Sequence, residues 1–154
     1  MDIAYINPFI EASQVVIKQA ANYQCRLGKV FVRSKPYEVG YPLIEVGLIG
    51  EIDGKAILCI PLQIALHIIS QMMMGMEVTK IDDIGQSALQ ELANMVMGNT
   101  ATILYNKGIG IDISTPRMSY GDGSLSPPAG MKTVSIPLIL DDLGAIELDI
   151  SFQE

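Results

Sequence analysis

The longest regular pattern of apolar and polar positions in the chain lies between residues 82 and 106. Apolar residues recur there at spacings of three and four, the repeat of one face of an α-helix, and no proline interrupts them. Asp82 and Asp83 suit the first turn, where carboxylates cap free N–H groups and meet the positive end of the helix dipole. Lys107 and Gly108 provide a stop, because glycine readily takes the left-handed conformation after a helix. We therefore predict one long helix over this range.

Two further helices are predicted on either side of the first group of strands. Asn7 is the expected N-cap of the first, with Pro8 at its first helical position, and the apolar repeat continues to about Tyr23. Another helix is expected to begin at Pro61 and to end near Met74.

The remaining apolar stretches are short and predict strands. They cover residues 29–34, 43–50, 55–60, 109–114, 132–140 and 145–152. The last strand alternates, with Glu147, Asp149 and Ser151 on its outward side, so we expect that sheet face to meet water. Pro137 cannot donate to a ladder, which favours a bulge or an edge position. The glycine- and proline-rich stretch 117–130 predicts a mobile loop.

The chain also repeats itself at a shift of 80 residues. This shift places Asn7 on Ser87, Glu11 on Glu91, Gln14 on Asn94, Gly28 on Gly108 and Pro36 on Pro116. Each half, about 7–60 and 87–152, is then a helix, a strand, a loop and a hairpin. We predict a single domain over residues 1–154 of the α+β class, a pseudo-twofold duplication with two long helices packed on a mainly antiparallel sheet.

Composition and charge narrow the class of function. The 154 residues are 49% apolar and 18% charged, which indicates a folded domain with a proper core. A net charge of −7 argues against nucleic acid or an anionic membrane as partner. Cys25 and Cys59 lack the spacing of a metal site, and neither a signal peptide nor a membrane-spanning run is evident. We expect a cytoplasmic protein without a metal of its own.

A polar stripe on the long helix is the strongest candidate for chemistry. Steps of four and three place Ser87, Glu91 and Asn94 one above another, and Gly98 continues the stripe one turn later. A small residue at Gly98 lets another backbone or a phosphate approach closely. No lysine or arginine lies within four residues of Glu91, so the helix gives this charge no local partner. Taken alone, the stripe also fits an ordinary solvated helix face.

The combined pattern resembles the CheC, CheX and FliY chemotaxis phosphatases. It consists of Ser-x-x-x-Glu-x-x-Asn on a long helix, a proline one strand later, and a duplicated frame that opens with Asn-Pro-Phe-x-Glu-Ala. Only the second half carries the motif intact, because the first half offers Glu11 and Gln14 in place of glutamate and asparagine. A motif that is intact in one half only is similar to CheX, which uses one such helix per subunit and acts as a homodimer. Members of the family dephosphorylate CheY-type response regulators.

The resemblance implies a role for each residue of the stripe. Asn94 would orient the attacking water, and Glu91 would pair with the active-site lysine of the phosphorylated regulator, so these two are the expected catalytic residues. Ser87 and Gly98 would contact the partner. The magnesium ion would belong to the regulator, so no cofactor is expected on this chain. Gln14, also a carboxamide, leaves a residual role for the first half open.

A second function fits the same residues. Flagellar switch proteins such as the middle domain of FliM are similar in fold and bind CheY without strong phosphatase activity. A chain of this kind would use the stripe only to dock, as a non-catalytic binding module. Asn94 favours the enzyme, because docking alone does not require a carboxamide there.

The composition also predicts self-association. Phe31 and Ile139 are apolar residues at outward positions, and an exposed sheet edge that carries such residues needs a partner. A twofold homodimer that joins two sheets edge to edge would satisfy the backbone and cover these side chains. We expect its interface to lie on strands, away from Ser87, Glu91 and Asn94.

Overall fold

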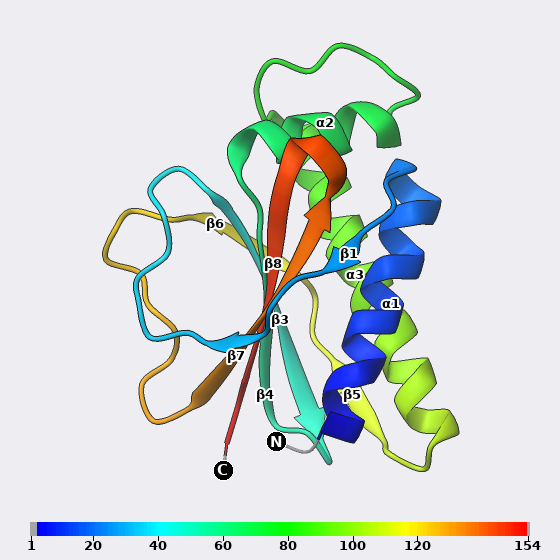
Figure 1. Ribbon diagram of the computed structural model, residues 1–154, viewed down its shortest axis with the longest axis vertical. Coiled ribbons are helices and arrows are strands. Elements are labelled where there is room, and N and C mark those ends of the chain that lie inside the picture. The colour runs from blue at the N-terminus through cyan, green and yellow to red at the C-terminus, as the bar shows by residue number, and fades with distance from the viewer. Residues whose placement is uncertain (1–2, 154) are drawn as a thin grey trace.

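The computed structural model describes residues 3–153 and places helices α1 (Ile3–Ala21), α2 (Leu62–Met72) and α3 (Asp83–Asn106) against an antiparallel sheet (Figure 1). The strand order is β1-β7-β8-β4-β3-β5, with β2 also paired to β7 and β6 also paired to β3. The strands are β1 (Arg26–Leu27), β2 (Phe31–Val32), β3 (Pro42–Gly50), β4 (Gly54–Cys59), β5 (Ile111–Ile113), β6 (Arg117–Tyr120), β7 (Lys132–Leu140) and β8 (Gly144–Phe152). A short 3₁₀ helix, Asp141–Leu143, joins β7 to β8.

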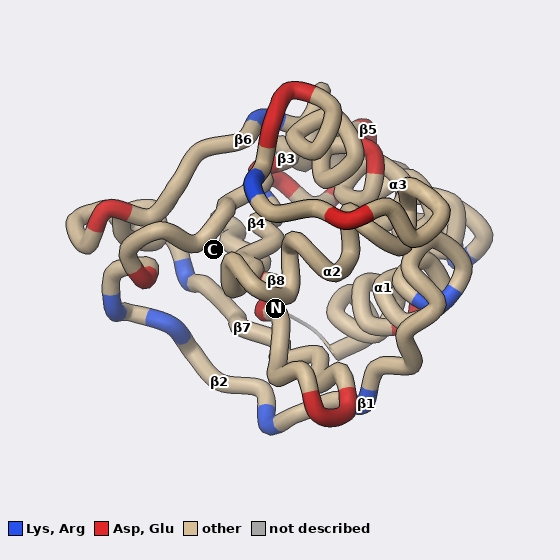
Figure 2. The backbone as a smooth tube through the Cα atoms, turned by 90° about the horizontal axis from the view of Figure 1, so that it is seen from above, with Lys and Arg blue, Asp and Glu red and all other residues tan. Residues whose placement is uncertain are grey.

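The two halves of the chain exchange strands around a pseudo-twofold axis. The hairpin β3–β4 comes from the first half and β7–β8 from the second, and β4 pairs with β8 at the centre. The short strands of the first half pair with β7, while those of the second half pair with β3. Helices α1 and α3 pack side by side and run antiparallel on one side of the sheet (Figures 1 and 2). The predicted α+β fold and its duplication are confirmed.

The long helix α3 begins and ends where its sequence predicts. The Asp82 side chain caps it by accepting a hydrogen bond from the Gly85 N–H at 2.8 Å. Gly108 follows the last turn with a φ of 83°, the left-handed conformation that glycine adopts without strain. These local signals therefore fix the helix that carries the stripe.

Helix α1 begins earlier than predicted, at Ile3, so Asn7 is not an N-cap and Pro8 lies inside the helix. Ile6 is only 8% exposed and packs in the core, and Pro8 is itself buried. Burying an isoleucine contributes about 2 kcal/mol, which offsets most of the roughly 3 kcal/mol that an internal proline costs. Tertiary packing thus extends α1 past its proline.

The main core lies between the helices and the near face of the sheet. Alternate residues of the central strands point into it, and α1 and α3 contribute their apolar faces. The fully buried members include Phe9, Ile44, Leu58, Leu92 and Leu148. This packing fixes α3 against β3 and β5 and leaves its opposite face exposed.

The predicted strand 29–34 is reduced to β2, and a bulge separates β2 from β1, which lies before the predicted range. Leu27 lies opposite Leu138 and Phe31 opposite Ser135, so four steps along one strand match three along the other. Pro137 lies within the shorter interval, where it has no N–H to offer. The expectation of a bulge at this proline is confirmed.

The far face of the sheet is covered, and the prediction that it meets water at β8 is wrong. Asp149 and Ser151 are fully buried, while Glu147 is half-buried. The cover is segment 33–41, whose Tyr37 is 2% exposed. Tyr37 forms a second small core with Leu43, Ile57 and Cys59, against which Tyr41 packs.

A buried polar network attaches this cover to the sheet. Arg33 Nε and Nη2 donate to the two carboxylate oxygens of Glu147, at 2.6 and 2.7 Å, and Nε also lies 3.2 Å from Asp149 Oδ2. The Tyr37 hydroxyl donates to Asp149 at 2.8 Å and the Ser135 hydroxyl at 2.7 Å. Burial and the neighbouring Glu147 raise the pKa of Asp149 to about 7. Both oxygens of this carboxyl group are thereby engaged by the fold.

The predicted mobile loop 117–130 begins too early, because residues 117–120 form β6 on the edge of β3. Arg117 lies opposite Glu45, and their side chains approach to 3.2 Å. The open edge of β3 provides backbone partners that no local sequence signal shows.

Candidate functional site

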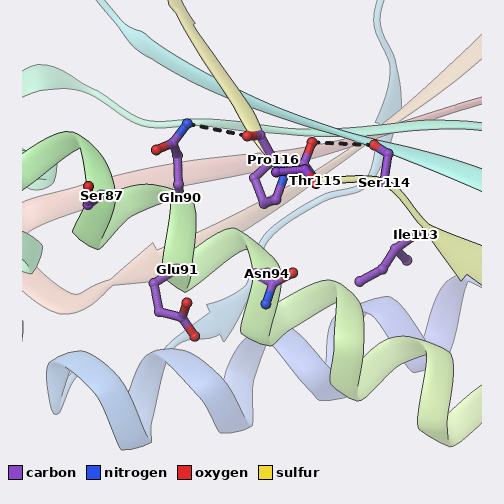
Figure 3. A pocket seen from close by; sticks show the side chains of 8 residues that line it. All are labelled: Ser87, Gln90, Glu91, Asn94, Ile113, Ser114, Thr115 and Pro116. Carbon is purple, nitrogen blue, oxygen red and sulfur yellow. Dashed lines mark hydrogen bonds between the residues drawn. The ribbon is translucent and has the colours of Figure 1, made fainter.

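The polar stripe forms one wall of an open recess of about 390 Å³ beside α3 (Figure 3). The opposite wall is the connection that leads from β5 to β6. The lining residues are Ser87, Gln90, Glu91 and Asn94 of α3 and Ile113, Ser114, Thr115 and Pro116 of the connection. The structure therefore brings together Ser87, Glu91 and Asn94 with the proline that the sequence pattern included.

The three polar side chains of the stripe are exposed and have no partner among the described residues. Ser87, Glu91 and Asn94 are all exposed, and no side-chain hydrogen bond or ion pair among residues 3–153 involves them. The buried face of the same helix is held in the core by Leu89 and Leu92, both 0% exposed. A rigid helix thus presents a carboxylate and a carboxamide to solvent, ready for a ligand from outside.

Gly98 lies one turn beyond the recess and does not line it. A Cβ built at Gly98 would meet no heavy atom within 4 Å, so nothing in the described chain requires a glycine there. Glycine inside a helix costs about 1 kcal/mol relative to alanine. Its presence on the exposed stripe fits the close approach of another molecule.

The electrostatics of α3 favour a cationic group at the stripe. Asp82, Asp83 and Glu91 are the charged residues between positions 82 and 106, and the first basic residue follows at Lys107. A lysine or arginine of a partner would therefore meet an attractive and uncompensated charge at Glu91.

Gln90 is a site residue that the sequence reasoning missed. Its Nε2 donates to the carbonyl oxygen of Pro116 at 3.2 Å and so joins α3 to the opposite wall (Figure 3). The internal repeat gave no signal here, because the shift of 80 places Gln90 on the apolar Ile10. The available clue was the position of Gln90 on α3, between the buried face of the helix and the polar stripe.

The corresponding residues of the first half are arranged differently. Glu11 is exposed, but Gln14 is half-buried and its Nε2 donates to the carbonyl oxygen of Cys25 at 3.3 Å. This carboxamide is engaged within the fold, whereas Asn94 is free. The two halves therefore share the same order of helix and strands, but the first half does not present a free carboxamide as the second half does.

The part of the chain that the structure describes contains neither a cluster of metal-ligating side chains nor a membrane-spanning helix. No three His, Cys, Asp or Glu side chains of residues 3–153 are grouped so that they could hold a metal ion. Within the same residues, no helix has the length and apolar character that crossing a membrane requires.

Known proteins with the same features are chemotaxis phosphatases. The family model "Chemotaxis phosphatase CheX" matches residues 43–138. The CheY-P phosphatase CheX of Thermotoga maritima is 32% identical over 122 residues, which are 79% of this chain and 78% of that protein. A chain of the crystallised CheX–CheY–BeF₃–Mg²⁺ complex from Borrelia burgdorferi is 28% identical, with a TM-score of 0.83 over 97% of this chain and 98% of that chain.

The fold agrees with these matches. The crystal structure of a CheC-like superfamily protein from Shewanella sp. PV-4 superimposes with a TM-score of 0.88 over all of both chains, at 24% identity. The family model covers more than half of the sequence, and it includes α3 up to residue 106 and the connection that forms the recess. The chain therefore belongs to the CheX family of chemotaxis phosphatases.

Proposed function

We propose that this chain hydrolyses the aspartyl phosphate of a CheY-type response regulator by placing Glu91 and Asn94 of α3 in the regulator's active site. The observation that carries the proposal is the state of these two side chains. They share the exposed face of a rigid helix and have no partner among the described residues. The relative from Thermotoga maritima, named for CheY-P as its substrate, supports the choice of regulator.

In the proposed reaction, a water molecule attacks the phosphorus in line with the bond to the regulator's aspartate. The P–O bond to the carboxylate breaks, a free aspartate and inorganic phosphate form, and the proton of the water passes to the phosphate. Asn94 accepts from and donates to this water, which is positioning work that needs no covalent step on this chain. The magnesium ion is supplied by the regulator, in keeping with the Borrelia burgdorferi complex, whose name includes CheY, BeF₃ and Mg²⁺.

Glu91 fixes the register of α3 in the complex. It lies three residues before Asn94, so its carboxylate can pair with the active-site lysine of the regulator while the carboxamide reaches the phosphate. Ser87 and Gly98 contact the partner on either side of this pair. Gly98 has open space around it, which supports the approach of another backbone at that point.

We further propose that the chain acts as one domain over residues 1–154 and forms a homodimer through the β1–β2 edge. The two halves exchange strands and share one core, which supports a single domain. Leu27, Phe31 and Val32 on that edge are 45%, 42% and 60% exposed. The recess adjoins β5 at the other end of the strand order, so a dimer of this kind leaves α3 free.

The test is the rate of phosphate loss from a CheY protein of the same organism, phosphorylated with acetyl phosphate. Asn94→Ala should abolish the stimulated rate while the fold remains intact, because one exposed amide contributes little to stability. The matched control is Gln14→Ala, which removes the corresponding carboxamide of the first half and should keep the wild-type rate. An Asn94→Ala protein with normal activity would refute the mechanism.

A further inference from the structure

We infer that Gln90 is a positioning residue of this site. Its amide holds the connection Ser114–Pro116 against α3 and so fixes the wall that faces Asn94. This inference rests on the function proposed above for Asn94, and it assigns Gln90 no contact with the phosphate or the water.

The connection is held to β3 at its two ends by the ladders of β5 and β6, and further hydrogen bonds fix the residues between them. On the sheet side, the Gly47 N–H donates to Ser114 Oγ at 2.7 Å, and the Ser114 N–H donates to the Gly47 carbonyl at 3.0 Å. On the helix side, the Gln90 side chain donates to the Pro116 carbonyl at 3.2 Å (Figure 3). Among the described residues, this is the side-chain hydrogen bond that links the connection to α3. Pro116 itself is buried, so its carbonyl has few alternatives for a donor.

Gln90 is placed where such a link controls the recess. It lies three residues after Ser87 and four before Asn94, so it occupies the same side of α3 one turn from each. The hydrogen bond from Gln90 to Pro116 therefore joins the two walls of the recess one helical turn from the Asn94 carboxamide. The width of the recess at Asn94 depends on it.

Loss of this bond should affect the rate more than the binding of the regulator. The connection would stay attached at Gly47 but could move away from α3, and the space for water next to Asn94 would widen. Misplacement of a reacting group by about 1 Å can cost on the order of 100-fold in rate. Glu91 and Gly98 would keep their places on the helix, so affinity should change little.

The experiment compares Gln90→Met with wild type in the dephosphorylation of a CheY protein carrying acetyl-phosphate-derived phosphate. Methionine keeps the length and helix propensity of glutamine and removes the donor. We expect kcat to fall about 10-fold with KM, and Kd for the beryllofluoride-bound regulator, within about twofold of wild type.

Ser70→Ala is the matched control. Ser70 Oγ donates to the Met76 carbonyl at 2.6 Å, so this variant also loses one bond from a helix to the loop that follows, but away from the recess. It should keep the wild-type kcat. Circular dichroism at the assay temperature checks that both variants are fully folded.

The outcomes separate this inference from the proposed function. A Gln90→Met protein with wild-type kcat, or one whose loss lies in KM and Kd instead, overturns the positioning role. If Asn94→Ala is inactive while Gln90→Met is normal, the inference alone fails. If Asn94→Ala is fully active, the proposed function fails.

Discussion

Replacing Gly98 with alanine should change stability and function in opposite directions. Gly98 lies in the interior of α3, where alanine is more favourable than glycine by about 1 kcal/mol. The new Cβ would meet no heavy atom within 4 Å, so no clash reduces the gain. The free energy of unfolding should therefore rise by about 1 kcal/mol, and Tm by roughly 2–4 °C for a domain of this size.

The same methyl group should weaken the complex with the regulator. If the partner's backbone approaches Gly98, the Cβ occupies space that the partner needs. We expect an affinity about tenfold lower, a loss of about 1.4 kcal/mol. Calorimetric unfolding measures the first effect, and titration with a beryllofluoride-bound CheY protein measures the second.

Gly85→Ala provides a control on the same helix. A Cβ at Gly85 would lie 3.2 Å from Ile69 Cδ1 and 3.3 Å from Asp82 Oδ1, so crowding should cancel the gain in helix propensity. A Gly98→Ala protein that is stabilised but binds as wild type would remove Gly98 from the interface. One that is destabilised would contradict the open space seen in the structure.

Three further predictions concern charge, pH and assembly. Glu91→Lys should weaken binding of the phosphorylated regulator more than Glu91→Ala, because a lysine would face a lysine, and equal affinity in a titration would refute the pairing. The pKa of Asp149, raised to about 7, means that the folded protein keeps a proton that the unfolded chain releases near pH 4. The free energy of unfolding should therefore fall as pH rises from about 4 to about 7 and then level off. Asp149→Asn should remove this slope in denaturant titrations, and an unchanged slope would assign it to another group. Sedimentation at micromolar concentration should show a wild-type dimer and a monomeric Val32→Asp protein that still dephosphorylates the regulator; a monomeric wild type would refute the edge-to-edge interface.

The sequence by itself determined α3 and the arrangement of its stripe. A helix places residues three and four positions apart on one face wherever it packs, so Ser87, Glu91 and Asn94 had to share a face once the helix was assigned. The four long strands β3, β4, β7 and β8 were also predicted to within one residue at each end. Their alternation and their glycine-containing turns are signals that the chain carries locally.

Only the tertiary structure decided which distant segments meet. The hydrogen bond of Gln90 joins residues 26 positions apart, and that of Tyr37 to Asp149 joins residues 112 apart. No periodicity records such contacts, because they depend on how the helices and the covering segment come to lie on the sheet. For this reason Asp149 reads as an outward residue of an alternating strand but is buried, and the second wall of the recess could be found only from the fold.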